Sequence, residues 1–177
     1  TSDQVSYLTT AQVENLTQAQ VESFTSDNFV GLRLDGLSTA RLVQVQTEDF
    51  AQLLQSQVQL LSTTQVDALT VEQVSALNAT RVGYLSSAQV EALSTANVVG
   101  LDLSGLDATR IAFLQTRDIA VLGSAQVAGI STVNIGGLTS VQLAALSTAN
   151  LFVLDTSSFN ALSSLQISGL NSNQVDT

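Results

Sequence analysis

The side chains of this chain that could do chemistry are carboxylates, hydroxyls and amides, because Lys, His, Cys and Met are absent from its 177 residues. Their absence removes the usual base of a catalytic triad, the thiol nucleophile and the Schiff-base amine. Glu48 and Asp49 form the one adjacent acid pair, and glycoside hydrolysis uses two carboxyl groups. Acids are also favoured in the first turn of a helix. We therefore expect the pair to stabilise the start of a helix, and we expect that the chain is not an enzyme.

A second candidate site is the turn that contains Asp102, Ser104 and Asp107 around Gly105. These residues offer oxygen ligands, but Ca²⁺ usually takes six to eight oxygens from a denser acidic loop. An ordinary polar turn is the favoured interpretation, Ca²⁺ is the minor alternative, and no other cofactor is expected. The net charge of −10, with five Arg and no Lys, argues against nucleic-acid partners. No apolar run is long enough to predict a membrane span.

An eight-residue repeat dominates the rest of the chain, as in SSAQVEAL followed by STANVVGL at residues 86–101. Twenty complete octads can be aligned, and their fifth and eighth positions are apolar throughout. In one long helix this stripe would wind around the surface. In a strand its odd spacings would place successive apolar residues on opposite faces. Neither regular element fits the pattern.

The polar positions indicate a series of very short helices instead. Sixteen of the twenty octads begin with Ser, Thr, Asn or Asp, the preferred N-cap residues. Gln stands three residues later in ten octads, as with Ser86 and Gln89, which is the pattern of a capping box. Helices this short are unstable alone. We therefore expect an all-α solenoid of capped helices that share one core, with a β-containing solenoid as the alternative.

Two five-residue segments interrupt the octads, RLDGL at 33–37 and DLSGL at 102–106. They begin 69 residues apart, and Arg41 and Arg110 correspond under the same shift, as do Asp49 and Asp118. We expect each insert to form a wider corner that resets the winding. The organisation predicted is a single repeat domain over 1–177, with long repeats at 33–101 and 102–170, a partial one at 1–32, and the start of another repeat at 171–177.

Runs such as TTAQVENLTQAQV and SSAQVEALSTANV resemble the octapeptide-repeat regions of very large bacterial surface or secreted proteins, which are often described as adhesin-like or haemagglutinin-like. The resemblance covers nearly the whole chain. It implies an extracellular or cell-surface segment with a spacer, adhesive or assembly role, and it transfers no catalytic residue. The glycine-rich, charge-poor octads after Gln115 depart from the pattern and put a uniform spacer role in doubt.

Residues 119–154 contain no charged side chain, although earlier octads carry acids at their solvent-facing positions. A solenoid exposed on all sides is expected to keep some charge over such a length. We hypothesise that this stretch contacts a second copy of the chain, or adjoining repeats of a longer parent chain. The alternative is drift of the repeat, with Ser, Thr and Gln keeping the surface polar. The candidate residues for self-association are Val121, Val133, Val141, Phe152 and Val153.

Together these observations predict a non-enzymatic structural or adhesive segment that acts outside the cell. Two alternatives remain open. One is a self-assembling subunit of an extracellular filament, because an open-ended repeat invites stacking. The other is a solenoid that binds peptide or glycan, which would need a row of aromatic or charged side chains along one face.

Overall fold

The computed structural model describes residues 1–175, which form twenty short α-helices and three 3₁₀ turns without any β-strand. The all-α prediction is confirmed, and the β-containing alternative is wrong. Residues 176 and 177 of the repeat expected at 171–177 lie outside the described residues. In chain order the elements are α1 (Ser2–Ser6), α2 (Thr10–Glu14), α3 (Gln18–Glu22), α4 (Ser26–Phe29), η1 (Leu34–Gly36), α5 (Thr39–Leu42), α6 (Thr47–Phe50), α7 (Gln55–Leu60), α8 (Thr63–Ala68), α9 (Val71–Ala76), α10 (Ala79–Val82), α11 (Ser87–Glu91), η2 (Val98–Gly100), η3 (Leu103–Gly105), α12 (Ala108–Ile111), α13 (Thr116–Ile119), α14 (Ser124–Ala128), α15 (Thr132–Ile135), α16 (Ser140–Ala145), α17 (Thr148–Phe152), α18 (Thr156–Asn160), α19 (Ser164–Ser168) and α20 (Ser172–Val175).

The first residue of an octad precedes and caps its helix, as the capping pattern predicts, except in the octad at 94–101, which forms the 3₁₀ turn η2. At the start of α11, the Ser86 N–H donates to Gln89 Oε1 at 2.8 Å, and the Gln89 N–H donates back to Ser86 Oγ at 3.3 Å. Where the first residue is Gly123, which has no side-chain oxygen, its N–H still donates to Gln126 Oε1 at 3.1 Å. The amide at the fourth position therefore caps the helix even where the hydroxyl is missing.

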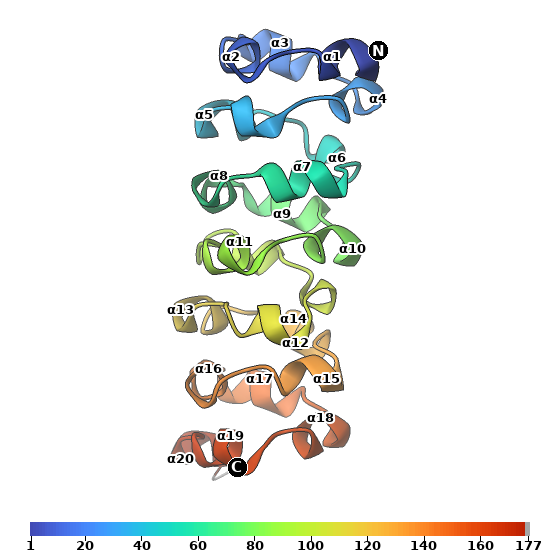
Figure 1. Ribbon diagram of the computed structural model, residues 1–177. Helices are drawn as coiled ribbons and strands as arrows, with labels where there is room; N and C mark the ends of the chain where they lie inside the picture. Colours follow the sequence, from blue (N-terminus) through green and yellow to red (C-terminus); the bar gives the residue numbers. More distant parts are fainter. Residues whose placement is uncertain (176–177) are drawn as a thin grey trace.

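Three consecutive repeats complete one turn of the solenoid. We call each octad, and each five-residue insert, a unit. Helices pack against the element that lies three units further along the chain, as in the series α5, α8, α11, α12, α15 and α18, or the series α13, α16 and α19. The turns follow one another along a single axis from the N-terminal to the C-terminal end (Figure 1). The molecule is an open stack in which each turn contacts its neighbours.

The inserts are shortened units, and the expectation of a wider corner is wrong. Each insert keeps the fifth to eighth positions of an octad, together with the residue before them, so that Leu103 and Leu106 occupy the two core positions. The 3₁₀ turn η3 replaces the helix of that unit and packs against α10, while η1 packs against α2 and α7. A 3₁₀ turn needs fewer residues than a helical turn, so the loss of three residues leaves the stack unbroken.

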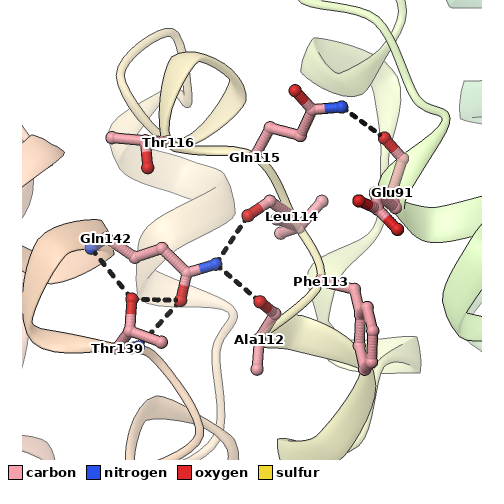
Figure 2. A pocket seen from close by; sticks show the side chains of 8 residues that line it. All are labelled: Glu91, Ala112, Phe113, Leu114, Gln115, Thr116, Thr139 and Gln142. Carbon is pink, nitrogen blue, oxygen red and sulfur yellow. Dashed lines mark hydrogen bonds between the residues drawn. The ribbon is translucent and has the colours of Figure 1, made fainter.

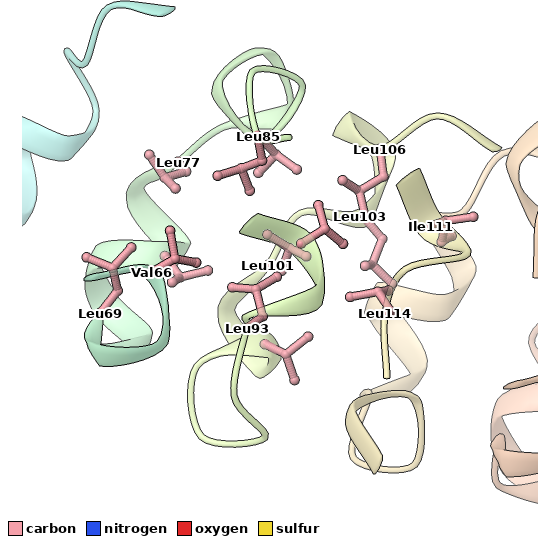
Figure 3. Close-up of a cluster of buried hydrophobic side chains, with 14 of the residues drawn as sticks. Val66, Leu69, Leu77, Leu85, Leu93, Leu101, Leu103, Leu106, Ile111 and Leu114 are labelled. Atoms are coloured by element: carbon pink, nitrogen blue, oxygen red, sulfur yellow. The ribbon is translucent and has the colours of Figure 1, made fainter. Parts of the chain in front are cut away.

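The core is a continuous column of the apolar side chains from the fifth and eighth positions. Figure 3 shows part of it, where Val66, Leu69, Leu77, Leu85 and Leu93 from successive units lie side by side. Nearly all of these side chains are fully buried between the first and last turns. Each unit thus places its two apolar side chains among those of its neighbours, which stabilises helices that are too short to persist alone.

The 69-residue period follows from the three-unit turn. Eight octads and one insert make nine units, which are three complete turns. Both inserts therefore occur at the same point of the cross-section, three turns apart. After one long repeat, the sequence pattern starts again at the same point of the cross-section.

Candidate functional sites

The most regular polar feature is a buried ladder formed by the fourth position of the units. The Nε2 atom of Gln89 donates to the carbonyl oxygens of Val58 and Leu61, both at 2.7 Å. These carbonyls belong to the fifth and eighth positions of the unit that lies four units earlier, in the preceding turn. Gln65 and Gln73 make the same pair of bonds to the carbonyls 28 and 31 residues before them. One buried amide thus caps its own helix and satisfies the carbonyls of the turn before it.

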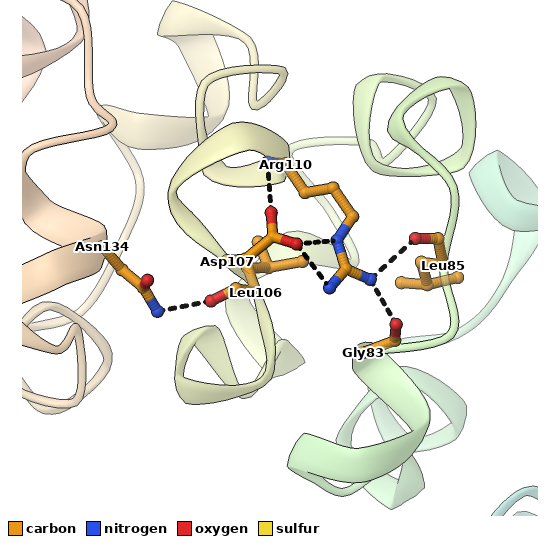
Figure 4. Close-up of polar contacts among 6 residues, drawn as sticks. All are labelled: Gly83, Leu85, Leu106, Asp107, Arg110 and Asn134. Atoms are coloured by element: carbon orange, nitrogen blue, oxygen red, sulfur yellow. Dashed lines mark hydrogen bonds and ion pairs between the residues drawn. The ribbon is translucent and has the colours of Figure 1, made fainter.

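Asn and Arg at the fourth position serve the same purpose. Asn97 Nδ2 donates to the Val66 and Leu69 carbonyls at 2.9 and 3.2 Å. In Figure 4, Asn134 reaches the Leu106 carbonyl, and Arg110 reaches the carbonyls of Gly83 and Leu85. Most fourth-position side chains of the described units therefore link two turns through an N–H donor.

The link between turns is the part of the site that sequence reasoning missed. The capping-box pattern accounts for the acceptor oxygen of Gln, but it gives no role to the amide nitrogen. The pattern also gives no role to Arg at the same position, yet Arg81 Nε donates to the Leu53 carbonyl at 3.0 Å. The available signal was that Gln, Asn and Arg share only an N–H donor.

The structure separates the carboxylates of the adjacent acid pair. Glu48 is exposed, whereas Asp49 is buried and accepts a hydrogen bond from Ser26 Oγ at 2.9 Å. Successive residues of a helix point in different directions, so the two carboxyl groups do not face one cleft. This arrangement lacks the opposed pair that glycoside hydrolysis requires.

The carboxylates of the 102–107 turn have partners within the chain. Asp102 Oδ1 accepts from the Ser104 N–H and from Ser104 Oγ, at 3.1 and 2.6 Å. Asp107 caps α12 through the Arg110 N–H at 2.8 Å and pairs with the Arg110 guanidinium at 3.0 Å. These hydrogen bonds lower the pKa of Asp107. Within residues 1–175 there is no cluster of three or more acidic side chains that could hold a metal ion.

The five residues proposed for self-association are exposed, but they lie on different sides of the stack. Val121 and Val141 belong to the neighbouring units of α13 and α16, which pack on each other. Val133 belongs to α15, while Phe152 and Val153 belong to the unit of α17. The exposed fractions reach 77% for Val133 and 62% for Phe152. A turn of three units gives the stack three sides. Val121 and Val141 lie on one of them, Val133 lies on the second, and Phe152 and Val153 lie on the third.

An open hollow of about 440 Å³ lies beside α13, and Figure 2 shows its lining. Its side-chain amides are already in use. Gln115 Nε2 donates to the Glu91 carbonyl at 2.8 Å, and Gln142 Nε2 donates to the Ala112 carbonyl at 3.0 Å. What remains for a ligand is Phe113, the Glu91 carboxylate and the Thr116 hydroxyl, so the amides of the lining serve mainly to join turns.

Two octads place a buried acid where the ladder has an N–H donor. Asp49 and Asp118 hold the fourth position of QTEDFAQL and QTRDIAVL, and both are buried, with 3% and 0% of their surface exposed. Burial raises the pKa of both carboxyl groups, in Asp118 against the opposing charge of Arg117. Neither oxygen of Asp118 receives a hydrogen bond. The sequence shows these two acids as a pair related by 69 residues, but it does not show their burial.

Comparison with protein families supports the repeat architecture over part of the chain. Residues 111–148 match the model of the ALTTAQ repeat. No curated protein matches the chain. None of the helices within residues 1–175 is long and apolar enough to cross a membrane. The chain thus contains a repeat region similar to the ALTTAQ repeat, folded as an all-helical stack.

Proposed function

We propose that this chain is a non-enzymatic structural segment, a spacer or scaffold that sets the distance between the parts it joins. The observation that carries the proposal is the use of its buried polar groups. Fourth-position amides such as Gln65, Gln73 and Gln89 are spent on capping a helix and on joining one turn to the preceding turn. A chain that uses most of its fourth-position side chains to join its turns is suited to mechanical work.

An extracellular or cell-surface location belongs to the same proposal. The chain contains neither Cys nor Met, the side chains that oxidise most readily. The acidic, Lys-free surface suits repulsion between neighbouring copies and gives high solubility. Adhesion is a secondary role that such a segment could combine with spacing, through residues displayed on its sides.

The experiment is small-angle X-ray scattering combined with light scattering over a wide range of concentrations. A spacer is expected to remain monomeric and to give the scattering of an elongated particle that matches the stack. A compact particle would contradict the proposal. Growth into long species as the concentration rises would favour the filament alternative.

The filament alternative has one observation in its favour, the exposed apolar side chains of the uncharged stretch 119–154. Phe152→Asp is expected to abolish any self-association, because a charge would be buried at the contact. Val99→Asp is the matched control. Val99 is 41% exposed, holds the same octad position, and lies outside that stretch. Equal association of both variants and the parent chain would reject a contact through Phe152.

Groove binding of peptide or glycan has less support. The aromatic side chains that are well exposed are Tyr7, Phe113 and Phe152. They belong to units far apart along the stack and form no row. Binding of a glycan or peptide with loss in the Phe113→Ala variant would revive this reading.

A further inference from the structure

The carboxyl group of Asp118 occupies a position built for a hydrogen-bond donor. In turns shortened by an insert, the fourth-position amide reaches the carbonyl 25 residues earlier, as Gln57 does to Leu32 at 3.0 Å and Gln126 does to Leu101 at 2.9 Å. By the same register, the carbonyl 25 residues before Asp118, that of Leu93, is the expected partner of its side chain. The side chain of Asn150 is as short as that of Asp, and its Nδ2 atom still donates to the Leu122 carbonyl in the preceding turn at 2.7 Å. The side chain of Asp118 is therefore long enough to make the contact.

If Asp118 were ionised, it would have no proton to donate, and its carboxylate could form no hydrogen bond with the Leu93 carbonyl oxygen. It has acceptor oxygens only, and no hydrogen bond reaches either of them in the structure. The nearest cation is Arg117, whose Nε lies 3.6 Å from Asp118 Oδ1 and whose side chain is 60% exposed. That distance is too long for a hydrogen bond, and an exposed partner is screened by solvent. A fully buried charge with such weak compensation is costly.

We propose that Asp118 is a neutral carboxylic acid that donates its proton to the Leu93 carbonyl, and that the joint between these two turns is consequently sensitive to pH. A protonated carboxyl group supplies one O–H donor, which replaces the amide N–H of the other units. Loss of the proton removes the bond and leaves a buried charge. Rising pH thus loosens the stack at this unit.

The charged surroundings agree with this assignment. The units before and after in the same series, STANVVGL at 94–101 and TSVQLAAL at 139–146, contain no titratable side chain. The charged groups nearby are Arg117 on the same helix, Asp67 on α8 and Glu91 on α11. Burial has the largest influence and raises the pKa of Asp118, as Asp67 also does. Arg117 and the backbone N–H of Gln115 lower it, although neither makes a hydrogen bond to an Asp118 oxygen.

Asp49 is the equivalent residue three turns earlier, and its carboxyl group, unlike that of Asp118, receives a hydrogen bond. Ser26 Oγ donates to Asp49 at 2.9 Å, which favours its ionised form, whereas Glu48 disfavours it. At the position equivalent to Ser26, the second long repeat has Thr95, and Asp118 receives no such bond. Asp118 is therefore expected to be the stronger of two related pH-sensitive points.

The direction of the pH effect follows from the raised pKa of the folded state. Between the ordinary Asp pKa of about 3.9 and the higher pKa of folded Asp118, the folded chain binds more protons than the unfolded chain. The stabilisation is therefore complete below the ordinary value and is lost as the pH rises through the folded value. In that window the unfolding constant is expected to rise by up to about tenfold per pH unit for one proton.

The test compares urea unfolding of the parent chain and of Asp118→Asn across pH. Asn supplies the N–H donor found in other units, so the variant is expected to fold and to lose this pH dependence. Asp107 and Asp155, whose pKa values are lowered by cap hydrogen bonds, destabilise both proteins equally on acidification and cancel in the comparison. Parallel pH profiles of the two proteins would overturn the proposal.

Two further measurements give the comparison independent readouts. Infrared spectra of the parent chain at a pH above the ordinary Asp pKa are expected to show a protonated carboxyl band that Asp118→Asn lacks. The converse variant, Asn97→Asp, is expected to acquire a new pH dependence of the same sign, because buried Asn97 holds the same position. Absence of the band, together with stabilisation of the parent chain by added Ca²⁺ or Na⁺ at neutral pH, would assign the site to a bound cation and reject the proton.

Discussion

At the scale of single residues, the fourth position decides how the chain holds together. Gln89 is buried and uses both ends of its amide, accepting from the Ser86 N–H and donating to Val58 and Leu61 in the preceding turn. The sequence allowed the first half of this role to be predicted, since a capping box depends on residues three apart. The second half joins residues 28 and 31 apart, and that separation follows only from the number of units in a turn.

Gln89→Leu is predicted to destabilise the chain by about 2–3 kcal/mol, because the buried carbonyls of Val58 and Leu61 lose their donor. Gln12→Leu is the matched control. Gln12 is exposed and its hydrogen bonds are confined to Thr9, so its loss should cost only about 0.5–1 kcal/mol, as for a helix cap. Urea unfolding of both variants measures the difference. Equal effects would mean that the bonds between turns add nothing.

At the scale of elements, the recurrence of the five-residue inserts could be predicted from the sequence, but their structure could not. Their regular recurrence was visible, but a pair of leucines around a glycine does not distinguish a corner from a shortened unit. The distinction lies in packing. A Cβ atom added to Gly105 would lie 2.2 Å from the Ala79 carbonyl oxygen and 2.8 Å from Val82 Cβ. The glycine is there because η3 lies directly against α10.

Gly105→Ala is therefore predicted to destabilise the chain by about 1–3 kcal/mol, the usual cost of overpacking. Gly123→Ala serves as the control, because the nearest atom to its added Cβ is 3.9 Å away. Its backbone has no positive φ angle, and Gly123 is the N-cap of α14. Alanine is a poorer N-cap than glycine but restricts the unfolded chain, so the two effects largely offset each other and stability should change by no more than about 0.5 kcal/mol. Thermal unfolding checks both. A Gly105→Ala variant as stable as the parent chain would contradict the close approach of η3 and α10.

At the scale of the whole molecule, periodicity predicted the class of fold and the core, while the winding had to come from the structure. Fifth and eighth positions such as Val74 and Leu77 are buried as the pattern indicates. The number of units per turn depends on how the short helices pack against one another, and no single octad encodes it. The uncharged stretch 119–154 was visible as well, but its division among three sides of the stack was not.

The measurement that tests the central claim most directly is an NMR study of the side-chain amides at the fourth position. The structure predicts nuclear Overhauser contacts from the Gln89 Nε2 protons to Leu61 and Val58, and slow exchange of those protons with solvent. The amide of Gln12 should show contacts to Thr9 only. Contacts of Gln89 confined to Ser86 and its own helix, with rapid exchange, would show that the amide caps its helix without joining the turns, and would contradict the three-unit stack.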